Sequence, residues 1–156
     1  MSQSFCMHPI ADHHVKIRSW LDWNVTSHLA FLPALVCAFA RNPPFYELTL
    51  FMTPTIFLSI IYHRLGEPRG TRIAMMDRVT ASVLFIYGLI QIHFSSDLFI
   101  KFMCAIFAVV VATTHVTGQI YPRVWKTTHS MGMHVIPGIW CLVVCQNNYP
   151  VFASDK

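Results

Sequence analysis

The chain has 156 residues, of which 54% are hydrophobic and 12% are charged, and its formal net charge is +4. So few charges cannot cover the surface of a water-soluble protein of this size, which excludes an ordinary soluble domain and favours a bilayer. The positive charge indicates membrane topology and contact with anionic lipids rather than a nucleic-acid-binding surface. We therefore expect an all-α, multi-pass integral membrane protein whose partners are membrane lipids.

Uncharged stretches predict the helices of this bundle in chain order. Residues 1–22 form a polar N-terminal tail on the cytosolic side. The following uncharged stretches are 23–40, 48–63, 79–96, 102–122 and 127–154. Each is close to the length of about 17 to 25 residues that one helical crossing requires, although Pro54 interrupts the second. Because the connections are short, we expect five transmembrane helices in one bundle over residues 23–154.

Lys and Arg residues are divided unequally between the two sides of this bundle. One side carries Lys16, Arg18, Arg64, Arg69, Arg72, Arg78, Arg123 and Lys126. The other side carries Arg41, Lys101 and Lys156. Because basic loops resist translocation, this distribution predicts a cytosolic N-terminus and an outside C-terminus.

The second predicted helix carries a polar stripe on an otherwise apolar segment. Thr55, Ser59 and His63 recur at intervals of four residues, which stacks them on one helical face. Such a face is expected to point into the bundle, where Ser59 orients the His63 ring or bonds to a neighbouring helix. A purely structural interpretation places His63 at the membrane interface beside Tyr62.

Asp77 precedes the third predicted helix. One interpretation is a helix N-cap, because Asp readily accepts hydrogen bonds from the first free backbone amides. The other is a general base, because Asp77 lies at the same end of the bundle as His63, where a metal-bound water would need one. Position along the chain does not choose between these roles.

The last predicted helix begins with His129 and His134. Neutral imidazoles suit a tetrahedral zinc ion, and a third histidine would leave one coordination position for water. Residues five apart differ by about 140° on a regular helix, so these two side chains would not share a face. A π-bulge at Gly132, or a loop position for His129, would remove this difficulty. Otherwise Ser130, four residues before His134, takes the ligand position.

The order of these motifs resembles a superfamily of seven-helix membrane hydrolases that includes alkaline ceramidases, progestin and adiponectin receptors, and post-GPI lipid-remodelling proteins. Its members carry Ser-x-x-x-His, then Asp, then His-x-x-x-His. The corresponding segments here are Ser59-Ile-Ile-Tyr-His63, Met-Met-Asp77-Arg-Val-Thr-Ala-Ser, and His129-Ser-Met-Gly-Met-His134. The chain departs from the pattern in having five predicted helices and four residues between the last two histidines.

The resemblance implies a zinc-dependent hydrolase that acts on a ceramide-like lipid amide or ester. His63, His129 and His134 would then bind zinc. Asp77 would hold and deprotonate the bound water, and Ser59 would help to stabilise charge on the carbonyl oxygen. The superfamily also contains receptors and other members without clear hydrolysis, so membership alone does not imply catalysis.

Two other classes of function fit the same residues. A haem-binding electron-transfer protein or respiratory-complex anchor would use facing histidines, such as His115 and His134, with His63 as a further axial candidate. A non-catalytic scaffold or receptor would use its polar residues for helix packing and lipid or protein binding.

The cysteines suggest no site by their spacing. They lie at positions 6, 37, 104, 141 and 145, and no two form a Cys-x-x-Cys pair. Most fall in apolar stretches, where cysteine behaves as a small hydrophobic residue. The sequence therefore predicts no disulfide.

Overall fold

A computed structural model describes residues 17–66, 71–121 and 125–148 of the chain, and within these ranges the regular structure is entirely helical. The first pass is composite and consists of α1 (Trp23–Thr26), the 3₁₀ segment η1 (Ser27–Phe31) and α2 (Leu32–Ala40). Three long helices follow: α3 (Tyr46–Arg64), α4 (Arg72–Phe94) and α5 (Leu98–Ile120). The last pass is again composite and consists of α6 (Trp125–His129), the π-helix η3 (Ser130–Val135) and α7 (Ile136–Asn147).

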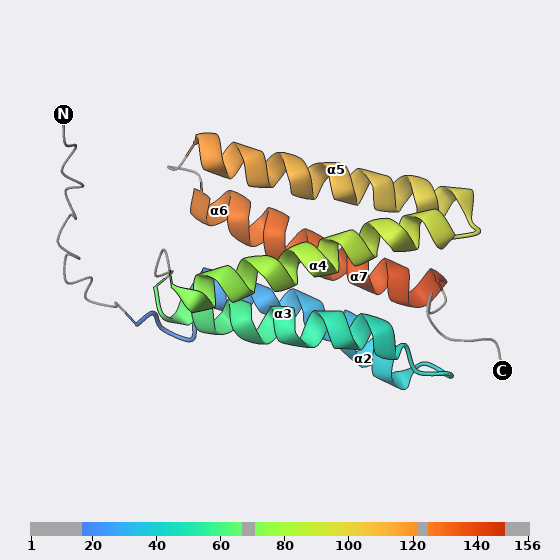
Figure 1. Cartoon of the computed structure of the whole chain (residues 1–156), viewed down its shortest axis with the longest axis horizontal. Coiled ribbons are helices and arrows are strands. Elements are labelled where there is room, and N and C mark those ends of the chain that lie inside the picture. The colour runs from blue at the N-terminus through green and yellow to red at the C-terminus, as the bar shows by residue number, and fades with distance from the viewer. Residues whose placement is uncertain (1–16, 67–70, 122–124, 149–156) are drawn as a thin grey trace, which may run out of the picture.

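The passes alternate in direction, so that the first and the last run parallel to each other (Figure 1). α2 packs against α7, and α3 packs against α4. α5 lies against α4 and against α7. As a result, segments more than a hundred residues apart in the chain become neighbours along the centre of the bundle.

The third pass, α4, begins earlier than the uncharged stretch 79–96 predicted. Thr71 is its N-cap, and the Thr71 side chain accepts a hydrogen bond from the backbone N–H of Ala74 at 3.2 Å. Asp77 therefore lies within α4 rather than before it, and its interpretation as an N-cap is wrong. The carboxylate of Asp77 is instead buried in the bundle.

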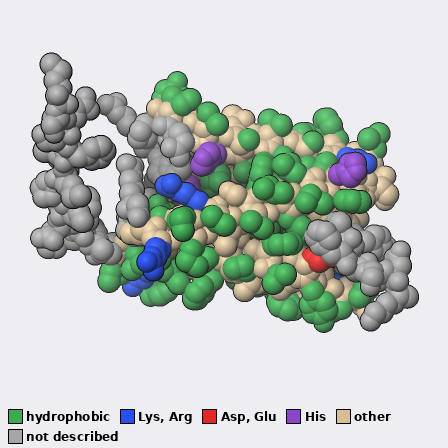
Figure 2. Space-filling model, viewed as in Figure 1, with side chains coloured by type: hydrophobic (Ala, Val, Ile, Leu, Met, Phe, Trp, Pro, Cys, Tyr) green, Lys and Arg blue, Asp and Glu red, His purple; other side chains and the backbone are tan. Residues whose placement is uncertain are grey.

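Four of the passes are long and apolar enough to cross a membrane. They are Trp23–Ala40, Arg72–Phe94, Leu98–Thr117 and Thr127–Asn147. The remaining pass, α3, has 19 residues and stays helical through Pro54. Its polar residues lower its mean hydropathy. Figure 2 shows hydrophobic side chains covering the middle of the visible face, with Lys and Arg near its two ends.

Glycines allow three close approaches between passes. A Cβ on Gly132 would overlap the side chain of Thr114 on α5, and a Cβ on Gly138 would overlap the backbone of Ala30 in η1. Gly88 on α4 faces the Trp140 ring, whose nearest carbon would lie 2.8 Å from an added Cβ. Small residues at helix contacts of this kind let backbones approach closely in membrane bundles. Two of these contacts fix the π-helix and α7 against their neighbours.

Candidate metal centre

Three separate passes bring histidine side chains to one end of the bundle. His28 comes from η1, His63 from the last turn of α3 and His134 from η3. All three are buried, and His63 has no exposed surface (0%). One ligand atom from each lies within 4.8 Å of the others, which is close enough for all three to hold a single metal ion.

His129 lies beside this group of three. Its Nε2 is 3.0 Å from the Nε2 of His63, and its ring centroid is 4.9 Å from that of His134. The five-residue spacing becomes compatible because residues 130–135 form a π-helix, whose hydrogen bonds join residues five apart. The predicted π-bulge around Gly132 is therefore confirmed.

The second nitrogen of His134 is held by a chain of hydrogen bonds. Its Nδ1 lies 2.7 Å from the Ser27 hydroxyl, which in turn donates to the backbone carbonyl of Asn24 at 3.4 Å. The Ser27 hydroxyl therefore holds the Nδ1 side of the His134 ring. A tautomer with its proton on Nδ1 leaves the Nε2 lone pair for a metal.

The Nδ1 atom of His28 is also held by a hydrogen bond. It lies 3.1 Å from the backbone carbonyl of Val25, which can only accept a hydrogen bond, so Nδ1 of His28 carries the proton. Its Nε2 is buried and has no hydrogen-bond partner among the described residues. A buried polar atom without a partner is costly unless a ligand satisfies it. This atom therefore points to a ligand that the protein's own side chains do not replace.

Ser130, the alternative to His129 as a ligand, has a different partner. Its buried hydroxyl donates to the side-chain oxygen of Asn24 at 2.8 Å. Asn24 thus accepts from both serines, through its backbone oxygen from Ser27 and through its side chain from Ser130. The buried Asn24 side chain therefore links η3, which carries His134, to the first pass. Hydrogen-bonded residues behind metal ligands hold the ligands in place in the same way.

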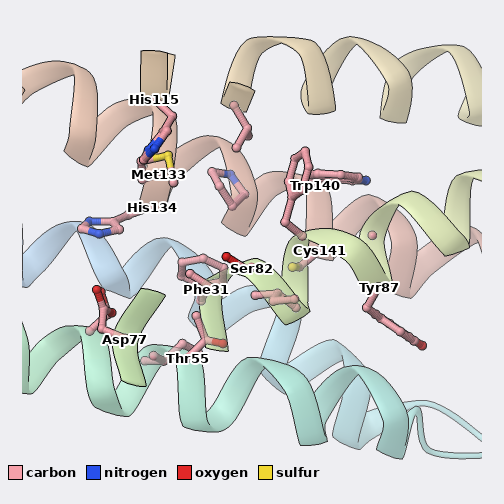
Figure 3. Close-up of a pocket in the computed structure, with 18 of the residues that line it drawn as sticks. Phe31, Thr55, Asp77, Ser82, Tyr87, His115, Met133, His134, Trp140 and Cys141 are labelled. Atoms are coloured by element: carbon pink, nitrogen blue, oxygen red, sulfur yellow. The ribbon is translucent and has the colours of Figure 1, made fainter. Parts of the chain in front are cut away.

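A cavity of about 640 Å³ extends from the histidines along the bundle. Asp77, Ser59 and Thr55 line it together with His28, His129 and His134. Figure 3 shows Asp77 and His134 at one end of this cavity, and Tyr87 and Trp140 toward the other. Beyond the histidine end the lining is mostly apolar and includes Phe85, Ile86, Val111 and Val144.

The two other described histidines are not part of this cluster. His115 lies on α5 at the rim of the cavity and is exposed, and His93 is exposed near the end of α4. His8, His13 and His14 fall outside the described residues. Of the described histidines, the four that converge are thus His28, His63, His129 and His134.

His28 is the member that the sequence motifs did not indicate. Its signal was a group of polar residues, Asn24, Ser27 and His28, at spacings of three and four in an otherwise apolar stretch. Such spacings place side chains on one helical face, which for polar residues in a membrane helix is the interior face. Attention to that pattern would have added the first pass to the site.

The donor set fits a borderline transition metal ion. Three imidazoles, two of which have their Nδ1 held by a hydrogen bond, are a common ligand set for zinc, while hard cations prefer oxygen ligands. Comparisons of the chain with protein-family models, with curated proteins and with solved structures give no match.

Proposed function

We propose that this protein is a multi-pass membrane protein that binds one zinc ion through His28, His63 and His134 and hydrolyses a lipid amide or ester. The observation that carries the proposal is the convergence of these three buried side chains within 4.8 Å. The hydrogen bonds that hold Nδ1 of His28 and of His134 support it further, as does His28 Nε2, which has no hydrogen-bond partner among the described residues. When bound at such a site, zinc supplies an activated water and a Lewis acid for a carbonyl group.

Asp77 and Ser59 have the roles that the superfamily resemblance suggests for them. Both line the cavity that the histidines face, and both are buried. The Asp77 carboxylate would accept the proton of the attacking water, and the Ser59 hydroxyl would donate to the carbonyl oxygen as negative charge develops there. The apolar remainder of the cavity suits the chain of a lipid, so the proposed substrate is an amphiphile whose amide or ester lies near Asp77.

His129 decides whether the site is open or closed. If it binds the ion as a fourth ligand, no position is left for water, and the site is structural. We assign it instead to a hydrogen bond with His63, because it is only half-buried whereas the other three are buried. The superfamily resemblance gave it a ligand role, and His28 takes that role in the present proposal.

A haem group fits these side chains less well than a single ion. The His28 and His134 rings are packed with their centroids 3.8 Å apart, and those of His63 and His134 are 5.0 Å apart. Axial ligands of haem approach the iron from opposite faces of a wide macrocycle, which rings in mutual contact cannot do. His115, the other axial candidate, is exposed at the cavity rim.

The five passes are proposed to span the membrane with the histidine end in the cytosol. Among the described residues, Arg18, Arg64, Arg72 and Arg78 lie at that end, and Arg41 and Lys101 lie at the opposite end. The excess of basic residues at the histidine end favours its retention on the cytosolic side. α3 would turn its polar face, Thr55, Ser59 and His63, inward.

Mass-spectrometric assay of lipid hydrolysis tests the catalytic part of the proposal. Purified zinc-loaded protein in detergent is incubated with ceramides and with ester lipids of matched chain length, beside a His63→Ala variant. We expect release of fatty acid that depends on zinc and is lost in the variant. If zinc is bound in stoichiometric amount and no amide or ester lipid is cleaved, the site is not hydrolytic.

A further inference from the structure

The end of the bundle opposite the histidines contains a pair of cysteines, one from the first pass and one from the last. Cys37 lies in the last turns of α2, and Cys145 lies near the end of α7. Their Sγ atoms are 2.8 Å apart, although the residues are 108 positions apart in the chain. A disulfide has an S–S distance of about 2.05 Å, so only a small side-chain movement separates this contact from a bond.

The surrounding contacts hold these two helix ends together. Arg41, which follows α2, donates hydrogen bonds to the backbone carbonyls of Cys145 and Asn148 at the end of α7. The other two described cysteines, Cys104 and Cys141, are fully within the buried core. Cys37 is partly exposed, whereas Cys145 is buried.

We propose that Cys37 and Cys145 form a disulfide on the non-cytosolic side of the membrane. This rests on the orientation given above, which places the end of the bundle that carries Arg41 outside the cytosol. Disulfides form and persist in such oxidising compartments. The two thiols lose two protons and two electrons as the Sγ–Sγ bond forms, and the disulfide of a thiol oxidoreductase accepts them by exchange and becomes a dithiol.

The disulfide would link the two passes that carry His28 and His134. At the histidine end these passes are joined by the Ser27–His134 hydrogen bond and the stacked His28 and His134 rings. At the other end the disulfide would close a loop of 108 residues. Cross-links that close long loops restrict the unfolded chain most, so this one would keep the first and last passes side by side.

Thiol counting on the full-length protein tests this proposal. The protein is made in membranes of the eukaryotic secretory pathway, denatured in SDS with excess N-ethylmaleimide, reduced, and labelled with a maleimide polymer. We expect two of the five cysteines to be labelled only after reduction, and peptide mapping without reduction to yield a peptide pair containing Cys37 and Cys145. The double label should disappear in Cys37→Ser and in Cys145→Ser, and persist in the matched Cys104→Ser control.

Two results would overturn the proposal. One is that no cysteine of the wild-type protein is protected from N-ethylmaleimide before reduction. The other is that peptide mapping joins a different pair. Zinc content is measured on the same preparation, so that failure of the disulfide proposal can be distinguished from failure of the proposed zinc site. A protein with free thiols can still bind zinc, and a disulfide-bonded protein can lack it.

Discussion

The two ends of the bundle are both polar and buried, but their polar groups are matched in different ways. At the end away from the histidines, Gln91 donates to the Tyr87 hydroxyl at 2.7 Å, and Tyr87 donates to Glu47 at 2.9 Å. Asn148 donates to both the backbone and the side-chain oxygen of Gln91. The donors of this network meet acceptors and tie α3, α4 and the end of α7 together, and of its members only the Asn148 side-chain oxygen is buried without a partner among the described residues.

At the histidine end, ring nitrogens face other ring nitrogens. Val25 and Ser27 bond the Nδ1 atoms of His28 and His134, while the Nε2 atoms of His63 and His129 lie 3.0 Å apart. His28 Nε2 has no hydrogen-bond partner among the described residues. The comparison teaches that burial of polar residues alone does not identify a site. Convergence of atoms of one chemical kind, two of them on rings whose other nitrogen is already hydrogen-bonded, is what indicates a ligand.

The largest functional effect is expected at Asp77. In Asp77→Asn the side chain keeps its size and loses its ability to accept a proton as a base, so lipid hydrolysis should fall by about 10²- to 10⁴-fold. Zinc content should stay unchanged because Asp77 is not among the converging ligands. The measurement is the initial rate of fatty-acid release at equal zinc occupancy. A rate within about threefold of the wild-type rate would remove Asp77 from the mechanism.

A smaller effect on stability is expected where the π-helix meets α5. An added methyl group in Gly132→Ala would overlap Thr114, including its Cβ, so the backbone of η3 must shift. Overpacking of this kind costs about 1 to 3 kcal/mol, and here it should also weaken zinc retention because His134 lies in η3.

Gly88→Ala provides the comparison for this variant. Its added methyl group meets the edge of the Trp140 ring. This ring can move more easily than the Cβ of Thr114, which is fixed to the backbone. Unfolding of both variants in mixed detergent and SDS, with zinc dialysis in parallel, should rank Gly132→Ala as the more damaging. Equal zinc retention in the two would show that the π-helix does not set the ligand geometry.

At the opposite end, Gln91→Met should affect stability and leave the metal site intact. The change removes hydrogen bonds to Tyr87 and Asn148 from a residue that is fully buried. The expected loss in the free energy of unfolding is about 1 to 3 kcal/mol. Gln146→Met, on the exposed side of α7, is the matched control and should be neutral. Loss of zinc in Gln91→Met would mean that the two ends are coupled.

The smallest effect is expected from His115→Ala. This histidine lines the cavity rim but is exposed, and it is not among the residues whose ligand atoms converge. Zinc content and thermal stability should match those of the wild type. A loss of bound metal would place α5 in the coordination shell, which the present ligand set does not include.

The sequence predicted the helical architecture and two of the three converging histidines, His63 and His134, for clear physical reasons. Apolar stretches long enough for a membrane indicated the passes, and the intervals of Thr55, Ser59 and His63 indicated an inward-facing stripe, which is buried. Of the alternatives that the five-residue spacing of His129 and His134 left open, the π-bulge is the one present. Local patterns are sufficient for these features because each is set within one helix.

Other features depended on contacts between distant passes. The start of α4 was misplaced because Arg72 and Asp77 were treated as outside the helix, although a charged residue facing the interior or the interface can lie within one. His28 and the Cys37–Cys145 contact join residues more than a hundred positions from their partners, and no local spacing predicts such pairs. Tertiary packing of the first pass against the last created both.

The central claim is that His28, His63 and His134 hold one metal ion, and metal content tests it most directly. Elemental analysis of the purified wild-type protein should find zinc near one equivalent per chain. His28→Ala and His63→Ala, each folded as judged by size-exclusion chromatography and circular dichroism, should lose it, while His115→Ala should retain it. A folded wild-type protein that binds no transition metal after incubation with zinc, or full zinc retention in His28→Ala, would contradict the account.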